Sequence, residues 1–248
     1  MSNDWKLASA YVTGRGHLAK NIPCQDRTSE LINKHSTGIF YGLSLADGAG
    51  SYKFSDIGAE IITKEILEYL KSNFSDSFKG KNVSKKILQY IEERLSKEAE
   101  KRSIDIKELS STLLFVVLKK DKFIAGHIGD GVIGVLGKKN HISVLSHPDN
   151  GEYSNSTFFT TTENYPDRLR IIRGNIVDST GFILMSDGVD KSLYDSRTKK
   201  LAPISAEIIN WLNIGNNEEV NIALQNNLNE IIKQKTFDDC SLGILKKY

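Results

Sequence analysis

The chain has 248 residues, of which 39% are apolar and 26% are charged, so its length and composition suit one globular domain with a substantial core. Lys and Arg number 33 against 31 Asp and Glu, and the resulting net charge of +2 is spread along the chain. This balance excludes a strongly basic or acidic protein, and we therefore expect no nucleic-acid or membrane partner from charge alone.

The first residues, the apolar runs and the cysteines bear on the cellular compartment. Residues 1–6 lack an apolar signal core, and the longest purely apolar run, residues 113–118, is far too short to cross a bilayer. Cys24 and Cys240 lie far apart in the sequence and form no CxxC pair, which is typical of reduced thiols in a reducing compartment. We therefore expect a cytoplasmic protein.

Short apolar runs bounded by Gly or Asp-Gly predict the strands, because several of these runs are rich in β-branched and aromatic residues. They cover residues 7–13, 39–46, 112–119, 123–128, 132–136, 182–185 and 242–245. Apolar residues at helical spacing predict helices over residues 57–70, 84–95, 205–212 and 218–232. Ser55 is expected to cap the N-terminus of the first helix.

The order of these elements predicts the fold class. Strands are followed by a helical pair, a run of strands, a second helical pair and a last strand. Consecutive strands joined by short turns favour antiparallel pairing over a parallel βαβ sheet. Two antiparallel sheets packed together with helices outside would bury all the apolar faces, so we expect an α+β sandwich formed by a single domain over residues 1–248.

Aspartates recur where the expected strands begin or end. Three of them follow an apolar strand and precede Gly, one lies after the first strand, and an acidic pair opens the last strand. They are Asp47, Asp130 and Asp187, then Asp26, and finally Asp238 with Asp239. Carboxylates that converge at one edge of a sandwich repel each other unless a cation lies among them. Oxygen-only ligands favour Mg²⁺ or Mn²⁺ over zinc. Asp-Gly is also an ordinary turn sequence, so this pattern alone leaves both a metal site and a set of turns open.

The residue sequences of these motifs resemble those of a known family. The motifs are Gln25-Asp26, Ala46-Asp47-Gly48-Ala49-Gly50-Ser51, Gly129-Asp130-Gly131, Ser186-Asp187-Gly188-Val189 and Asp238-Asp239-Cys240-Ser241. In order and spacing they resemble the PP2C (PPM) phosphatase family over about residues 10 to 245. The sequence from Gly14-Arg15-Gly16-His17 to Gln25-Asp26 is similar to the compact bacterial branch of that family.

The resemblance implies a four-layer α-β-β-α sandwich and a metal-dependent serine/threonine protein phosphatase that forms no covalent phosphoenzyme. It implies two Mn²⁺ or Mg²⁺ ions, with Asp47 bridging them and the Gly48 carbonyl on one. Asp187 and Asp238 would hold the other ion directly or through water, Asp26 would bind an ion directly or lie immediately behind the direct ligands, and Asp130 would help to hold a third ion. The implied partner is a phosphorylated protein, either a partner kinase or one of its targets.

The chain also departs from the family pattern. Gln25 stands where many relatives have Glu, and Ala49 stands where some have a His that protonates the leaving alcohol. These two residues motivate an alternative, a pseudophosphatase module that recognises a phosphorylated partner without turnover. A different metal phosphohydrolase is disfavoured, because paired histidines and a strand-borne DxD motif are both absent from the sequence.

Three further positions are interpreted from the resemblance. The phosphate-binding Arg of the family has no certain counterpart here, and Arg15, His17 and Lys20 are the candidates, with His17 favoured. Asp190 falls one residue short of an extra metal-binding Asp, so we expect a surface residue. Residues 147–173, rich in Ser, Thr and Asn, occupy the place of a mobile flap or form a plain solvated loop.

Overall fold

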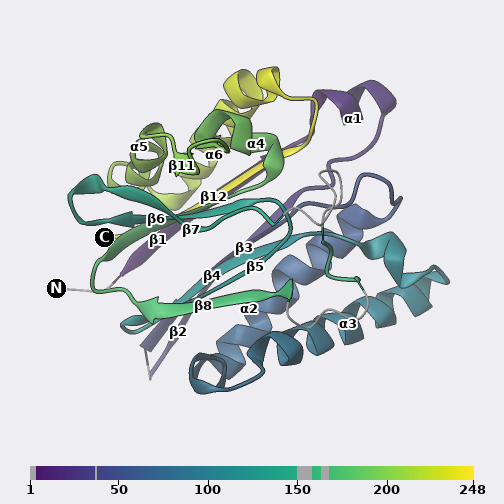
Figure 1. Ribbon diagram of the computed structural model, residues 1–248, viewed down its shortest axis with the longest axis horizontal. Coiled ribbons are helices and arrows are strands. Elements are labelled where there is room, and N and C mark those ends of the chain that lie inside the picture. Colours follow the sequence, from purple (N-terminus) through teal and green to yellow (C-terminus); the bar gives the residue numbers. More distant parts are fainter. Residues whose placement is uncertain (1–3, 37, 150–157, 163–167) are drawn as a thin grey trace.

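The computed structural model describes residues 4–36, 38–149, 158–162 and 168–248, and these residues form two five-stranded antiparallel sheets packed face to face (Figure 1). The first sheet has the order β1 (Trp5–Val12), β12 (Cys240–Lys247), β9 (Ser179–Met185), β6 (Val132–Gly137) and β7 (Ile142–Ser146). The second has the order β2 (Arg27–His35), β3 (Gly38–Ala46), β4 (Leu113–Lys119), β5 (Lys122–Ile128) and β8 (Arg170–Asn175).

Helices cover the outer face of each sheet (Figure 1). The long helices α2 (Ser55–Lys79) and α3 (Val83–Arg102) lie on the second sheet, while α4 (Asp187–Leu193), α5 (Ile204–Asn210) and α6 (Asn217–Asn227) lie on the first. The short α1 (Arg15–Lys20) lies at one end of the sandwich, and β10 (Tyr194–Asp195) pairs with β11 (Lys200–Leu201). Single turns of 3₁₀ helix occupy Ile106–Leu109, Lys138–Asn140, Trp211–Asn213 and Lys233–Lys235. The predicted α-β-β-α sandwich is confirmed.

The core has one apolar cluster in each interface between layers. One cluster lies between the first sheet and its helices, one between the second sheet and α2 with α3, and one between the sheets. In the last, the fully buried Phe182 ring lies 5.9 Å from that of Trp5 and 5.3 Å from that of Phe123, measured between ring centroids. Aromatic burial of this kind fixes how one sheet is placed on the other.

Strand register brings distant segments to one end of the sandwich. In the second sheet Leu45 pairs with Leu114, and Leu113 pairs with Ile128. In the first sheet Met185 pairs with both Val132 and Leu242. The segments that follow β3, β5 and β9, and those that precede β4, β6 and β12, therefore share that end. The aspartates of the sequence motifs all lie on these segments or on the one before β2.

Several elements differ from the sequence prediction. Strands β2, β7 and β8 were not expected, and β8 includes residues 170–173 of the expected flap. Ser55 is not a helix cap: Phe54 holds that position, and the buried Ser55 hydroxyl donates to the Tyr52 carbonyl at 3.1 Å. The predicted last helix is α6 followed by a π-helical turn at Leu228–Ile232.

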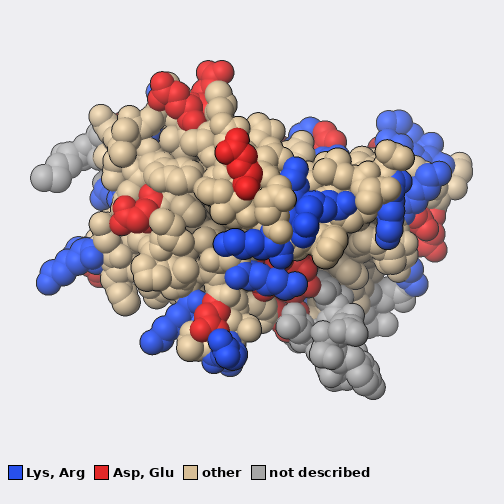
Figure 2. Space-filling view, turned by 90° about the horizontal axis from the view of Figure 1, so that it is seen from above, with Lys and Arg blue, Asp and Glu red and all other residues tan. Residues whose placement is uncertain are grey.

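The surface over α4 to α6 carries basic and acidic side chains interspersed with each other, without a field of a single sign (Figure 2). Among the described residues, no helix is both long enough and apolar enough to cross a membrane. The interspersed charges over α4 to α6 agree with the even charge balance of the sequence.

Candidate metal centre

Three aspartates converge at the shared end of the two sheets. Asp47, Asp130 and Asp187 each place a carboxylate oxygen within 4.8 Å of the other two. Hydrogen bonds hold the first of them in place: the Asp47 amide donates to the Thr112 hydroxyl at 2.9 Å, and the Thr112 amide donates to the Asp47 carbonyl at 2.8 Å. Within the described part of the chain, this is the one group of three or more potential metal-binding side chains.

The glycine after each of these aspartates is explained by close packing of the backbone. A Cβ atom on Gly188 would lie 1.9 Å from the Asp239 carbonyl oxygen, and one on Gly131 would lie 2.6 Å from the Met185 carbonyl oxygen. A Cβ on Gly48 would lie 2.9 Å from the Gln25 carbonyl oxygen. The alternative that each Asp-Gly is an ordinary turn does not hold for Asp187 and Gly188, because these two residues begin helix α4. Only glycine allows these segments to approach so closely.

The carboxylates of the cluster are poorly hydrated and repel each other. Asp26 is completely buried, and neither of its carboxylate oxygens has a hydrogen-bond partner. Burial raises the pKa of Asp26 to about 8; the nearby Ser241 and Ser186 hydroxyls oppose this rise, and the charges of Asp239 and Asp187 add to it. Burial and the charges of Asp130 and Asp238 raise the pKa of Asp187 to about 7. Burial also raises the pKa of Asp47 well above its ordinary value, with Asp26 as the next largest cause.

These properties fit a divalent cation among the aspartates. Both oxygens of Asp26 and one oxygen of Asp187 are buried without a protein partner, which is costly unless another group satisfies them. A cation removes both the mutual repulsion and the unsatisfied oxygens. The donors are all carboxylate oxygens, as Mg²⁺ and Mn²⁺ prefer.

Asp190 belongs to the same acidic neighbourhood, so its interpretation as a plain surface residue is wrong. Its side chain is half-buried, and one carboxylate oxygen is buried without a hydrogen-bond partner. Burial raises its pKa, and the charge of Asp130 adds to the effect. Its place on the first turn of α4, three residues after Asp187, turns it toward the cluster because residues three apart share a helix face.

Asp238 and Asp239, the acidic pair before β12, have different environments. Asp238 is exposed and lies near Asp187, whose pKa its charge raises. Asp239 is buried, and its carboxylate accepts hydrogen bonds from the Gly14 amide at 2.7 Å and the Gln25 amide at 2.6 Å. Asp239 therefore links the segments before and after α1 to the start of β12.

His17 also contacts Asp239. Its Nδ1 lies 2.9 Å from a carboxylate oxygen of Asp239, an ion pair when the ring is protonated. Arg15 is engaged elsewhere: its Nε donates to the Thr236 carbonyl at 2.9 Å and its guanidinium lies 4.5 Å from the Phe237 ring centroid. Lys20 is exposed on α1. Of the three candidate phosphate contacts, His17 is the one held next to the acidic motifs.

Gln25 and Ala49, the two departures from the family pattern, are both buried beside the cluster. The Gln25 side-chain amide donates to the Tyr52 carbonyl at 3.1 Å, and its oxygen is buried without a hydrogen-bond partner. The Ala49 amide donates to the Ser110 carbonyl at 3.0 Å. Gln25 thus brings one more unsatisfied oxygen, uncharged, to the same end of the sandwich.

One buried network beside Asp130 was not predicted from the sequence. His127 is completely buried, its Nε2 donates to the Gly129 carbonyl at 2.8 Å, and its Nδ1 lies 2.8 Å from the Ser146 hydroxyl. Burial lowers the pKa of His127 to about 3, with the Arg170 charge as a second cause, so the ring is neutral. Gly129 has φ = +106°, a conformation that glycine adopts readily and other residues do not, and the histidine holds the Gly129 carbonyl immediately before Asp130.

The expected flap is described only in part. Residues 150–157 and 163–167 lie outside the described residues, so the flap interpretation stays a prediction. In the part that is described, the Thr160 amide donates to the Ser111 carbonyl at 3.0 Å. This contact places residues 158–162 against Ser111, which adjoins the Thr112 that is hydrogen-bonded to Asp47.

Comparison with known proteins identifies the fold and then the family. A structure described as a bacterial serine phosphatase has a TM-score of 0.68 at 14% identity, covering 99% of this chain and 98% of that chain. The catalytic domain of the serine threonine protein phosphatase PstP, in complex with two manganese ions, has a TM-score of 0.61 at 13% identity, covering 98% and 97%. The chain has the fold of these phosphatases.

The family follows from sequence. The model of the protein phosphatase 2C family matches residues 13–232, so the chain belongs to this family. Serine/threonine-protein phosphatase 3 of Escherichia coli (strain K12) is 28% identical over 169 residues. That match spans 66% of this chain and 66% of the relative.

Proposed function

We propose that the chain is a metal-dependent serine/threonine protein phosphatase that hydrolyses phosphoserine and phosphothreonine in proteins. The observation that carries this proposal is the convergence of Asp47, Asp130 and Asp187 beside the buried, unsatisfied Asp26. Family membership supports the reaction, and the manganese ions of PstP support the choice of metal. The proposed substrate is a phosphorylated protein in the cytoplasm, either a partner kinase or a target of one.

The residues proposed to hold two Mn²⁺ or Mg²⁺ ions are Asp47 with the Gly48 carbonyl, and Asp187 with Asp238. Asp26 would bind one of the ions directly or lie immediately behind their ligands, and Asp130 would help to hold a third ion. Divalent ions bound in such a cluster supply an activated water nucleophile and neutralise charge on the phosphoryl oxygens. The protein's part is to hold these oxygens in place before substrate binds, which preorganises the site.

The hydrolysis consumes water and yields inorganic phosphate and the free hydroxyl of serine or threonine, without a phosphorylated enzyme. The thiols support this direct route. Cys24 and Cys240 are both buried, and burial raises the pKa of Cys240 to about 12 and that of Cys24 further still. Because the thiolate is the nucleophile, neither thiol is suited to attack phosphorus at neutral pH.

His17 is proposed to contact the phosphoryl group of the substrate. Its Nδ1 is oriented by Asp239, which leaves the Nε2 side of the ring for a ligand. Protonated His17 would offer both charge and a donor to an anionic group. With Ala49 in place of the family histidine, protonation of the leaving alcohol falls to another group.

The second candidate is a phosphopeptide-binding module without turnover, favoured by the uncharged Gln25 and by Ala49. Hydrolysis of p-nitrophenyl phosphate separates the two, measured with Mn²⁺, with Mg²⁺ and with EDTA. The proposal predicts turnover that requires metal and falls at least about a hundredfold in Asp47→Asn, with no change in Asp178→Asn, where an exposed surface aspartate is neutralised. Phosphopeptide binding in EDTA, without turnover under either metal, would support the binding module.

A further inference from the structure

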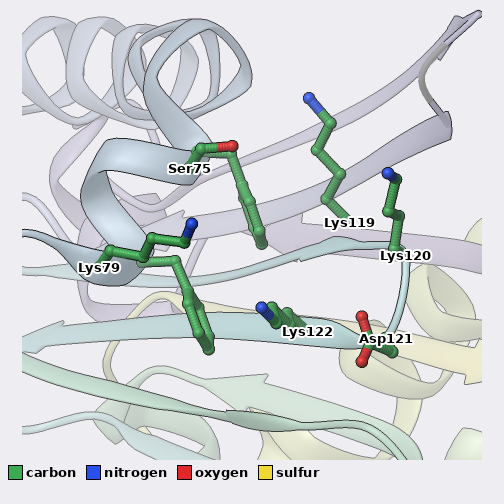
Figure 3. Close-up of a pocket in the computed structure, with 8 residues that line it drawn as sticks. Ser75, Lys79, Lys119, Lys120, Asp121 and Lys122 are labelled. Atoms are coloured by element: carbon green, nitrogen blue, oxygen red, sulfur yellow. The ribbon is translucent and has the colours of Figure 1, made fainter.

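A pocket of about 340 Å³, drawn in Figure 3, lies beside the β4–β5 hairpin, and β4 runs from the aspartate end of the second sheet to this hairpin. Its walls come from the last turns of α2 and from the hairpin that joins β4 to β5. Lys79 on α2 and Lys119, Lys120 and Lys122 on the hairpin line it, together with one acidic residue, Asp121.

The pocket concentrates positive charge that the sequence appeared to spread evenly. Four lysines face one aspartate here, which locally exceeds the net charge of +2 of the whole chain. Among the described residues, none of the four lysines is within ion-pair distance of a carboxylate. A cluster in which charges of one sign outnumber those of the other attracts an oppositely charged partner and speeds its association.

An aromatic wall lies behind the lysines. The rings of Phe74 and Phe78 stack with centroids 6.3 Å apart and an interplanar angle of 13°. Phe74 is buried, whereas Phe78 is partly exposed and has the Lys122 ammonium 4.7 Å from its ring centroid. The pocket therefore offers a small apolar surface with ammonium groups around it.

The chemistry of these groups indicates the class of ligand. Lysines are flexible point charges, and the lining contains no arginine, whose planar fork suits bidentate phosphate binding. Several carboxylates spaced along an extended segment match separated ammonium groups, and an aliphatic side chain among them matches Phe78. We propose that this pocket, formed by Lys79, Lys119, Lys120, Lys122 and Phe78, docks an acidic peptide segment of a protein partner.

The distance to the aspartates sets the spacing that a substrate needs. Thr112, which bonds to Asp47, immediately precedes β4, and Lys119 ends it; the two are seven residues apart, or about 24 Å at the rise of an extended strand. A peptide that reaches both sites must span at least about seven extended residues. This part of the inference rests on the proposed function: favoured substrates carry an acidic segment at least that far from the phosphorylated residue.

Direct binding tests the pocket without any need for catalysis. A fluorescent, unphosphorylated peptide of alternating Glu and Leu is titrated with the protein in EDTA at low salt, and its anisotropy is measured. The test variant is Lys119→Gln with Lys120→Asn, and Lys79→Gln is a second variant that leaves the hairpin unchanged. The matched control is Lys199→Asn with Lys200→Gln, because Lys199 shares the positive φ of Lys120, 55° against 58°, and asparagine tolerates this conformation.

We expect the double variant to bind the peptide at least about fivefold more weakly and the control to bind as the wild type does. Equal affinity of wild type and double variant, or an equal loss in the control, would overturn the proposal. Tighter, lysine-dependent binding of a single-stranded RNA oligonucleotide than of the peptide would also overturn it. Melting temperatures of all variants establish that any loss of affinity is not a loss of folding.

Kinetics test the link to substrate choice. Two phosphoserine peptides share the same phosphorylated core, and one carries the acidic block twelve residues away. We expect the block to lower KM for the wild type but not for the double variant, with kcat and the hydrolysis of p-nitrophenyl phosphate unchanged. An equal KM for both peptides would overturn the substrate inference. Absence of all turnover would instead contradict the proposed function, and the anisotropy titration would still decide the docking site.

Discussion

Replacing Asp239 with asparagine tests whether the acidic pair of β12 has two separate roles. The Asp239 carboxylate accepts from the Gly14 amide, the Gln25 amide and His17 Nδ1 at 2.6 to 2.9 Å. Asparagine keeps one oxygen, so its NH₂ group faces at least one buried donor. A buried donor without a partner costs about 1–3 kcal/mol, and we expect Asp239→Asn to lower the free energy of unfolding by about 2 kcal/mol.

The assay is urea denaturation in EDTA at pH 7.5, followed by circular dichroism. The control is Asp238→Asn. The Asp238 side chain keeps an exposed edge, but the surrounding protein partly desolvates its carboxyl group. This desolvation and the charge of Asp239 raise the pKa of Asp238, which makes its negative charge unfavourable in the metal-free protein. Asp238→Asn is therefore expected to unfold at the wild-type urea concentration or above, while losing metal affinity. Wild-type stability for Asp239→Asn, or equal destabilisation of both variants, would refute this division of roles.

Three further predictions concern the same end of the molecule. The raised pKa values of Asp26 and Asp187, about 8 and about 7 against about 3.9 when unfolded, mean that the metal-free fold binds more protons than the unfolded chain. Its melting temperature in EDTA should therefore fall between pH 5 and 8.5, and a rise over that range would contradict the acidic cluster. Gly188→Ala places a Cβ 1.9 Å from the Asp239 carbonyl, so calorimetry should show a loss of about 2 kcal/mol despite the better helix propensity of alanine; an unchanged melting temperature would exclude this close contact. His127→Phe removes the donor to the Gly129 carbonyl and should lower Mn²⁺ affinity at the Asp130 side of the cluster with kcat/KM falling in parallel, whereas a change in stability alone would assign it a purely structural role.

The strands that the sequence did not predict are edge strands. β2 and β8 are the two edges of the second sheet, and β7 is an edge of the first. β2 reads RTSELINKH and is mostly half-buried or exposed, so it has no apolar run for a pattern to detect. β1 is also an edge strand, but its buried positions follow an apolar pattern and α6 packs against it, so it was predicted correctly. Edge strands carry less apolar signal because less of their surface is buried.

Some residues of the candidate site could be predicted from the sequence and others could not, also for physical reasons. The positions of Asp47, Asp130 and Asp187 at one end of the sandwich could be predicted. The end of a strand can be located from nearby sequence alone, and antiparallel pairing then brings these strand ends together. The roles of Asp239, Asp190 and His127 depend on contacts across the fold, such as the link from Asp239 to Gly14 over 225 positions of sequence. Which of two adjacent aspartates faces solvent is set by packing and not by composition.

The lysine pocket illustrates the same limit for surface charge. Lys79 and the lysines of the β4–β5 hairpin are about forty positions apart, and the overall balance of 33 basic against 31 acidic residues conceals them. Only the antiparallel hairpin at the far end of β4, beside the last turn of α2, brings them together. A local field can therefore exist in a chain whose net charge predicts none.

The central claim is that the aspartate cluster is a divalent metal site, and calorimetric titration of Mn²⁺ into the metal-free protein tests it most directly. The account predicts at least two bound ions per chain at pH 7.5. It also predicts proton release, seen as a heat that depends on the buffer, because carboxyls with raised pKa values must lose protons to bind metal. Asp47→Asn should abolish the tightest binding. No saturable binding by the wild type, or binding that Asp47→Asn leaves intact, would contradict the account.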